Sequence, residues 1–443
     1  MSVNQTVQGD SAQSTAQKQG LAKPVLAVAA LLWAMLLAMA ASALMGIIVA
    51  LRIEGQGLNS AVTGVVMASY FAGLVIGAWY SSNAINSIGH IRAFAASATL
   101  VSASFIMFPL AEHWLAWSLF RFFAGLGFAC MITAVEAWLN DRTPSLVRGS
   151  VLAVYVVVST VAQLLGQLMV NIWPISQAEP FMIASILLSL SLLPVTITRM
   201  PAPELTDVEP FSMKELYHTS PTAITGCIGS GLLIGMTLSF AAIFAKRLGF
   251  SLAETSYFAS ALIAGGALFL FPIGAISDRM DRRLMLVAVL LGGALFAALL
   301  VLGGFIGFPP WIMIILAMLF GGMMYAIYPL AQTQVFDYIP QRKYTSAAAG
   351  LNMTYSVGAT LGPLLISFIL DWHPSALFMG IALISGFVGI FVLYRMSIRD
   401  SLPIEEQETV TLVTVAPSVE SLAMGFDVLD EADTPEKSDS TVC

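Results

Sequence analysis

Two charged side chains stand inside a long apolar segment of this 443-residue chain, where an unpaired charge is costly. Arg121 lies about seven residues into the apolar run 114–139, and Glu136 lies about fifteen residues further on. On a helix they would share one broad face, about 22 Å apart along the axis. Arg121 could bind an anionic group of a solute, tune a nearby proton site, snorkel outward or fix a helix contact. Glu136 could take up a proton near neutrality, or pair near the helix end with a basic residue such as Arg92.

Polar side chains recur at helical spacing in three other apolar runs. In the run 149–173 five of them are four residues apart and form a slowly winding stripe: Tyr155, Ser159, Gln163, Gln167 and Asn171. The run 310–334 places Tyr325, Tyr328 and Gln332 on one face, and the run 345–370 adds Asn352 and Tyr355. Such stripes favour a cavity wall for an uncharged or heterocyclic solute, although interhelical hydrogen bonds use the same pattern. The predicted solute-binding residues are Arg121, Gln163, Gln167, Tyr325, Tyr328, Asn352 and Tyr355.

The elements that hold these side chains follow from the composition. Hydrophobic residues make up 58% of the chain and charged residues 10%, against roughly 25% charged in a soluble domain. Runs of about 20 apolar residues cross a bilayer as helices, which satisfy every backbone polar group internally. The twelve such runs are 25–50, 60–80, 91–111, 114–139, 149–173, 180–199, 221–245, 255–276, 284–305, 310–334, 345–370 and 374–395. We therefore predict an all-α membrane protein with twelve transmembrane helices.

The distribution of Lys and Arg predicts the orientation. With both termini in the cytoplasm, fifteen of the 19 basic residues face the cytoplasm. Only Arg52, Lys246 and Arg247 face the other side, and Arg121 lies within a helix. We expect a multi-pass protein of the cell membrane, in bacteria the inner membrane, with both termini cytoplasmic.

The chain repeats itself at two nearly constant offsets. A shift of 192 carries Gly57, Ala61, Thr63, Ala72 and Gly73 onto Gly249, Ala253, Thr255, Ala264 and Gly265. A shift of 196 carries Gly125, Asp141, Pro144, Leu165 and Gly166 onto Gly321, Asp337, Pro340, Leu361 and Gly362. The offsets predict two six-helix halves, 24–199 and 220–398, joined by a cytoplasmic linker at 200–219. The tail 1–23 and the acidic tail 399–443, which more than accounts for the net charge of −7, are predicted to be disordered.

A short charged segment separates the runs 255–276 and 284–305. It reads Gly274-Ala-Ile-Ser-Asp278-Arg279-Met-Asp281-Arg282-Arg283. This segment resembles the loop signature of the major facilitator superfamily, Gly-x-x-x-Asp-Arg-x-Gly-Arg-Arg, with Asp281 in place of the second glycine. The resemblance implies two parallel halves around a midplane site and a cytoplasmic gate. The gate residues it implies are Gly274, Asp278, Arg279, Arg282 and Arg283, with Asn86 and Gly89 from a degraded copy of the loop in the first half.

Further motifs extend the resemblance over about residues 24–398. The segment Arg121-Phe-Phe-Ala-Gly125 is similar to the family's Arg-x-x-x-Gly. The stretch from Glu136 to Arg142, together with Tyr328-Pro329-Leu, resembles the YcaD-type branch. Where drug/proton antiporters of the family carry Gly-Pro, this chain has Gly166-Gln167, which lowers an antiporter interpretation.

These features predict a secondary active transporter that moves a small organic solute by alternating access. We expect it to be a monomer coupled to protons, with Glu136 as the proton-coupling residue. The sequence has no nucleotide-binding loop and no His cluster, so we expect no enzyme activity, no cofactor, no metal and no nucleic-acid partner. Drug-type efflux instead of nutrient uptake stays open, as does a non-transporting sensor or scaffold on the same fold.

Overall fold

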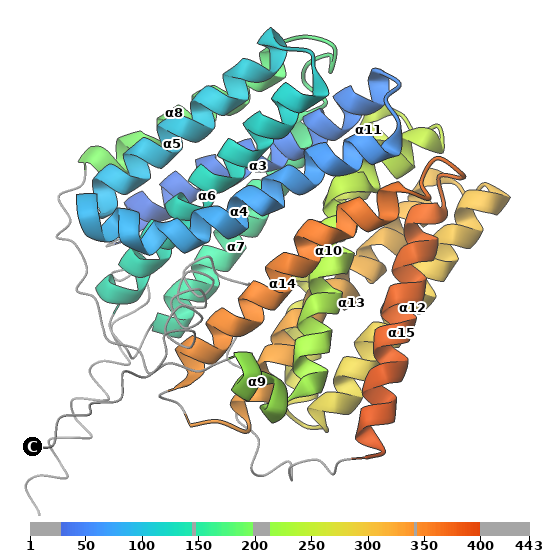
Figure 1. The fold of residues 1–443 in the computed structure, drawn as a ribbon. Helices are drawn as coiled ribbons and strands as arrows, with labels where there is room; N and C mark the ends of the chain where they lie inside the picture. Colours follow the sequence, from blue (N-terminus) through green and yellow to red (C-terminus); the bar gives the residue numbers. More distant parts are fainter. Residues whose placement is uncertain (1–27, 144–147, 198–212, 341–342, 399–443) are drawn as a thin grey trace, which may run out of the picture.

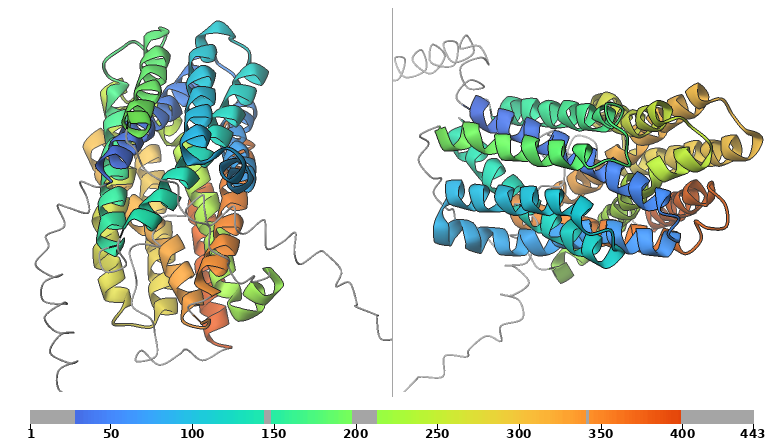
Figure 2. Two further views of the ribbon diagram at one scale, coloured as in Figure 1. Left: turned by 90° about the vertical axis from the view of Figure 1, so that its left-hand side faces the viewer. Right: turned by 90° about the horizontal axis from the view of Figure 1, so that it is seen from above.

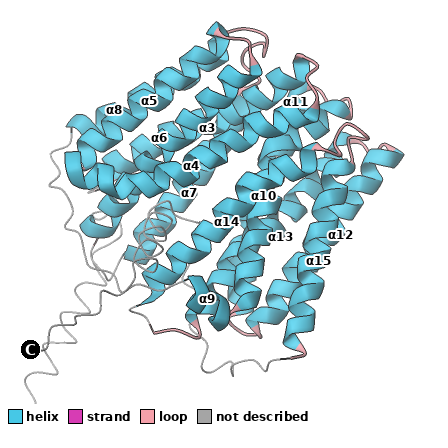
Figure 3. Cartoon of the chain, viewed as in Figure 1, coloured by secondary structure: helices cyan, strands magenta, loops and turns pink. Residues whose placement is uncertain are grey.

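The computed structural model describes residues 28–143, 148–197, 213–340 and 343–398. Within these ranges the secondary structure is helical and includes no strand (Figure 3). The predictions for the two tails, 1–23 and 399–443, fall outside the described residues. Of the predicted linker 200–219, the structure describes the short helix α9, Met213–Thr219.

Twelve long helices make up most of the described chain, as the apolar runs predict. They are α3 Ala29–Gly55, α4 Ser60–Ile88, α5 His90–Met107, α6 Trp114–Arg142, α7 Arg148–Met169, α8 Glu179–Ile197, α10 Pro221–Arg247, α11 Leu252–Ser277, α12 Arg282–Ile306, α13 Pro310–Phe336, α14 Tyr344–Ser367 and α15 Ala376–Met396. Eleven of these described helices are long and apolar enough to cross a membrane. The exception is α14, whose sequence includes Asn352 and several threonines and serines and is therefore less apolar.

The helices form two groups of six (Figure 1). Helices α3 to α8 make one half and α10 to α15 the other, and the same grouping appears in the turned views (Figure 2). The halves meet where α4 packs against α14, α7 against α11, and α3 against α10. The prediction of an all-α membrane protein built from two six-helix halves is confirmed.

Glycines bring helices into backbone contact within each half, and the contacts repeat at the sequence offsets. Any Cβ at these glycines would collide with a neighbouring backbone carbonyl. In the first half the pairs are Gly73 with Phe122, Gly125 with Tyr70, and Gly166 with Ala40; in the second they are Gly265 with Met318, Gly321 with Leu262, and Gly362 with Leu232. Each residue of the second set follows its counterpart by 192 or 196 positions. The repeat therefore preserves a packing geometry that requires small residues.

The helices end alternately at two ends of the bundle. We call the far end the one with the connections α3–α4, α7–α8, α10–α11 and α14–α15, and the tail end the one where α3 begins and α15 ends. The two halves converge at the far end and diverge toward the tail end (Figure 1). At the far end Gly64 of α4 also lies against Ser367 and Pro363 of α14. The described structure is thus closed across the halves at the far end.

Candidate functional site

A cavity of about 320 Å³ lies between the two halves, in the part of the bundle nearer the far end. Its wall comes from four helices of each half: α3, α4, α6 and α7 on one side, and α10, α11, α13 and α14 on the other. Most of the wall is apolar, with residues such as Ile47, Phe71, Phe128 and Leu262. A small solute in this cavity would touch both halves at once.

Arg121 supplies the charge of this wall. The other described lining residues are uncharged. The Arg121 side chain is 4% exposed, and its guanidinium carbon lies 4.5 Å from the ring centroid of Tyr70, within cation–π range. Its Nη2 atom approaches the sulfur of Met67 at 4.0 Å, and its Nε atom has no hydrogen-bond partner. No carboxylate pairs with Arg121 among the residues that the structure describes.

The cavity brings together five of the seven predicted solute-binding residues. Arg121, Gln163, Gln167, Tyr325 and Tyr355 line it. Tyr328 and Asn352 lie behind the wall in this state, 1% and 2% exposed. Tyr328 packs edge-on against Tyr355, with ring centroids 5.3 Å apart. Their binding roles stay predictions.

Sequence reasoning missed the neighbours that orient Arg121. Tyr70 of α4 lies beside the guanidinium, and its hydroxyl is 3.2 Å from that of Ser42 on α3. The contact arises because Gly125, one turn beyond Arg121, lets α6 approach the backbone of Tyr70. The sequence signal was the Arg-x-x-x-Gly spacing, but it does not name the partner helix.

Glu136 lies further along α6, toward the tail end, and does not line the cavity. It is partly buried and interacts electrostatically with Tyr155 of α7, the first residue of the predicted polar stripe. The predicted separation from Arg121 therefore holds along the helix. The alternative pairing with Arg92 is not among the ion pairs between described residues.

The charged segment 274–283 forms the tail-end turn between α11 and α12, and Arg282 is its anchor. Arg282 is 2% exposed and donates from Nη1 to Asp337, at 2.9 Å, and to the carbonyl of Thr333, at 3.2 Å. Its Nη2 atom lies 3.8 Å from Asp278. These contacts tie α11, α12 and α13 together within the second half.

The remaining predicted gate residues occupy the tail-end turns. Gly274 is buried near the end of α11, whereas Arg279 is exposed. Arg283 is largely buried and faces Asp281, with Nε and Oδ1 3.5 Å apart. In the first half, Asn86 is exposed and Gly89 turns the chain from α4 to α5 with φ of +84°, a conformation that favours glycine. Their gating role stays a prediction.

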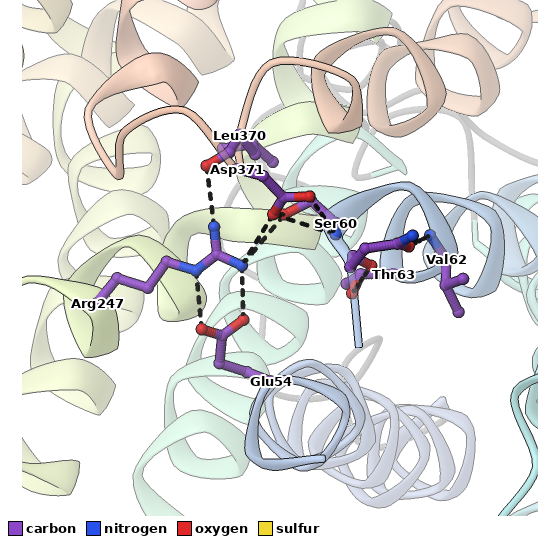
Figure 4. A network of polar contacts seen from close by, with 8 residues as sticks. Glu54, Ser60, Val62, Thr63, Arg247, Leu370 and Asp371 are labelled. Carbon is purple, nitrogen blue, oxygen red and sulfur yellow. Dashed lines mark hydrogen bonds and ion pairs between the residues drawn. The ribbon is translucent and has the colours of Figure 1, made fainter. Parts of the chain in front are cut away.

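An ion-pair network links the two halves at the far end, and sequence reasoning did not predict it (Figure 4). Arg247, at the end of α10, holds both carboxylate oxygens of Glu54, at the end of α3, at 2.8 and 2.9 Å. It also donates to the Leu370 carbonyl at 2.9 Å and lies 3.6 Å from Asp371. Asp371 in turn accepts hydrogen bonds from the backbone N–H and hydroxyl of Ser60, at the start of α4.

A second polar contact crosses the halves nearby. Asn171, just beyond α7, donates to the Ser256 hydroxyl of α11 at 2.7 Å. Arg52, by contrast, stays within the first half, where it donates to the Ile175 carbonyl at 2.7 Å and pairs with Glu112 at 3.2 Å. The far end thus carries one arginine that crosses the halves and one that does not.

Comparison with known families identifies the class of protein that this fold and cavity define. The sequence profile of the Major Facilitator Superfamily matches residues 30–307 and 223–422. The chain belongs to this family, as the loop segment predicted. Because the family and its matching relatives are transporters, the chain is a membrane transporter by family and not an enzyme.

Individual relatives support the branch resemblance. An uncharacterized MFS-type transporter of Enterobacter sp. strain 638 is 26% identical over 390 residues, which cover 86% of this chain and 98% of the relative. The uncharacterized MFS-type transporter YcaD of Salmonella arizonae is 25% identical over 378 residues, 82% of this chain and 94% of the relative. The chain is thus similar to YcaD-type transporters over nearly its whole membrane region.

Two solved structures share the fold. A D-xylose-proton symporter superimposes with a TM-score of 0.65 at 16% identity, covering 88% of this chain and 100% of the symporter. The nucleoside transporter NupG superimposes with a TM-score of 0.66 at 13% identity, covering 82% of this chain and 98% of NupG. At these identities the likeness establishes the fold alone.

The buried pair at the tail end predicts a stability difference. Asp337→Asn leaves the buried Arg282 guanidinium short of its nearest counter-charge, which costs roughly 3–5 kcal/mol of unfolding free energy for such pairs. The lower end is expected, because Asp278 remains 3.8 Å away. The control is Asp281→Asn, which keeps a helix-capping side chain on α12 and should change stability by less than about 1 kcal/mol. Denaturation of both purified variants measures this, and equal losses would contradict the anchoring role of Arg282.

Proposed function

We propose that the protein is a secondary transporter that moves a small organic solute across the membrane by alternating access. The observation that carries the proposal is the cavity of about 320 Å³, walled by four helices of each half. A site shared by both halves can face either side when the halves rock against one another. The structural neighbours are named for xylose and nucleosides, which are also small organic solutes.

The described state supports access from the tail end. Among the described residues, polar contacts join the halves at the far end from Arg247 to Glu54, from Ser60 to Asp371 and from Asn171 to Ser256. The halves diverge in the opposite direction (Figure 1). Alternation would require these contacts to break while the tail-end turns close.

The basic residues support a cytoplasmic tail end. The sequence assigns fifteen of the 19 Lys and Arg residues to segments predicted to be cytoplasmic, whereas Arg52, Lys246 and Arg247 belong to the far-end segments. We predict that a fluorescent protein fused after residue 443 of a bacterially expressed chain is active, whereas alkaline phosphatase at the same point is inactive. The reverse pattern would overturn the orientation. Fusions within the α7–α8 connection serve as the opposite-side control.

We propose that a proton gradient drives transport and that Glu136 carries the coupled proton. A carboxylate partly buried in a membrane helix takes up a proton more readily than one in water, and the Tyr155 hydroxyl beside it can share the hydrogen bonding. The position of Glu136 between the cavity and the tail end suits a group whose exposure changes as the halves move.

The test is solute accumulation in proteoliposomes with an imposed pH gradient, over a panel of small organic solutes. A protonophore should abolish accumulation. Glu136→Gln should also abolish it while leaving exchange down a solute gradient, because a neutral amide cannot carry the proton. The control Glu215→Gln removes an exposed acid of the short helix α9, which does not line the cavity, and should leave accumulation unchanged. Accumulation that survives the protonophore would rule out proton coupling.

The gate hypothesis uses the same assay. Because carboxylates favour helix N-termini, we propose that Asp278 accepts hydrogen bonds from the first turn of α7, near Arg148 and Gly149, when the tail end closes. Asp278→Asn should slow transport with normal membrane insertion. Wild-type rates in this variant would contradict the gating role.

A further inference from the structure

No described residue that lines the cavity supplies an anionic partner to Arg121. Arg121 is 4% exposed, its Nε atom is unbonded, and its nearest electron-rich neighbours are the Tyr70 ring and the Met67 sulfur. Removing a charged side chain from water is costly, and a cation–π contact offsets only part of that cost. The described neighbours therefore leave the guanidinium under-compensated.

The fold does not need this charge. A shift of 196 carries Arg121 onto Ala317 in the second half. There, α13 packs against α11 through Gly321 and Leu262, the same contact that α6 makes with α4 through Gly125 and Tyr70. Since an alanine serves this packing in one half, the arginine in the other is available for a ligand.

The rest of the wall limits what that ligand can be. The lining contains no acid and no second base. Polar contacts are available from Gln163, Gln167, Tyr325 and Tyr355, among mainly apolar neighbours. A volume of about 320 Å³ is near the lower end for ligand pockets. The wall therefore suits one negative charge on a small apolar body.

We infer that the solute is a small organic monoanion, whose carboxylate or similar group accepts charge-assisted hydrogen bonds from Arg121. The planar guanidinium matches a carboxylate through two parallel hydrogen bonds. The apolar body then lies between the halves, against the aromatic and aliphatic wall. This inference rests on the transport function proposed above, because it assigns the substrate class of the same cavity.

Matched acid and amide probes test the inference directly. Binding of benzoate, hexanoate and naphthoate to the purified protein is compared with binding of benzamide, hexanamide and naphthamide by calorimetry. At least one carboxylate should bind at least tenfold more tightly than its amide. Arg121→Gln should remove that preference, whereas Arg92→Gln, which removes an exposed charge at the tail end, should retain it.

Each other outcome is decisive. Equal binding of acids and amides, binding of none of the acids, or an unchanged preference in Arg121→Gln would overturn the inference. A structural role for Arg121 would appear as a lower unfolding temperature of Arg121→Gln, so Arg121→Lys, which keeps the charge without the planar fork, provides a second variant and should bind carboxylates more weakly. Charge-selective binding without flux in proteoliposomes would contradict the proposed transport while supporting the anion site.

The far-end network carries a second inference by itself. Arg247 holds Glu54 of the first half through two hydrogen bonds, and it supports Asp371, which caps α4 of the first half through Ser60 (Figure 4). One guanidinium thus joins α3, α10 and the α14–α15 connection, and it reaches α4 directly through the Ser60 hydroxyl at 3.1 Å and indirectly through Asp371.

The geometry points to Arg247 as the latch that keeps the far end closed and that must release for the cavity to open there. Its side chain is 19% exposed, and that of Glu54 is 20% exposed. Both charges remain close enough to water to be rehydrated on opening, unlike the fully buried Arg282. A partly exposed, bidentate pair is strong enough to bias a conformation and weak enough to break reversibly.

The separation of two labelled sites across the far end shows whether the latch is closed. Spin labels at Ser176→Cys and Ile306→Cys, both exposed far-end sites on opposite halves, report their separation in nanodiscs. Cys443→Ser removes the thiol at the C-terminus, and Cys130 and Cys227 are buried. Arg247→Gln should raise the population with a long separation about tenfold, which corresponds to about 1.4 kcal/mol. Arg52→Gln, at the same end but bonded within one half, should leave the distribution unchanged.

Charge exchange gives the complementary test. The double variant Glu54→Arg with Arg247→Glu should restore the short separation that either single variant loses, because the pair is rebuilt with opposite polarity. If Arg247→Gln does not fold, Glu54→Gln provides the same measurement. An unchanged distribution in the variants of Arg247 and Glu54, or an equal change in Arg52→Gln, would overturn the latch.

Discussion

Close backbone contact between helices is the constraint on which the rest of this structure depends. Glycines such as Gly125 and Gly321 let α6 and α13 touch the backbones of α4 and α11, with no room for a side chain. In an apolar medium, packing of this kind replaces the hydrophobic drive that holds soluble helices together. The helices of each half are therefore tightly packed against one another. The cavity lies at the surface between the halves.

The buried and half-buried ion pairs differ according to whether they lie within one half or between the two halves. Arg282 and Asp337 form a buried pair inside one half, where nothing needs to separate them. The pair of Arg247 with Glu54 crosses the halves, and its residues stay partly exposed, so the cost of parting them is reduced by water. Arg121 differs from both pairs: it is buried at the surface between the halves, and no described residue supplies a carboxylate to it.

The sequence predicted the helices, the two halves and five polar residues that line the cavity, for physical reasons that can be named. The apolar runs predict helices, and the two offsets predict the halves, because both patterns can be read along the chain itself. Gln163 and Gln167 were predicted in the same way, from their spacing on a single helix. The partners of Arg121 and Arg247 could not be predicted in this way. Glu54 and Arg247 are 193 positions apart, and no helical spacing reports which helix ends meet. Tyr328 shows another limit, because spacing on one helix does not report that it is 1% exposed and packs edge-on against Tyr355 of another helix.

The two arginines have different relations to the proposed movement between the halves. Arg247 interacts with the opposite half directly, so its contacts favour one conformation whether or not solute is present. Among the described residues, Arg121 interacts with Tyr70 and Met67, which both lie in its own half. A solute on Arg121 can nevertheless reach Tyr325 and Tyr355 across the cavity and so link the halves. Because a ligand shifts a conformational equilibrium only by the difference in its affinity for the two states, the contacts to α13 and α14, and not the contact to Arg121 alone, must supply that difference.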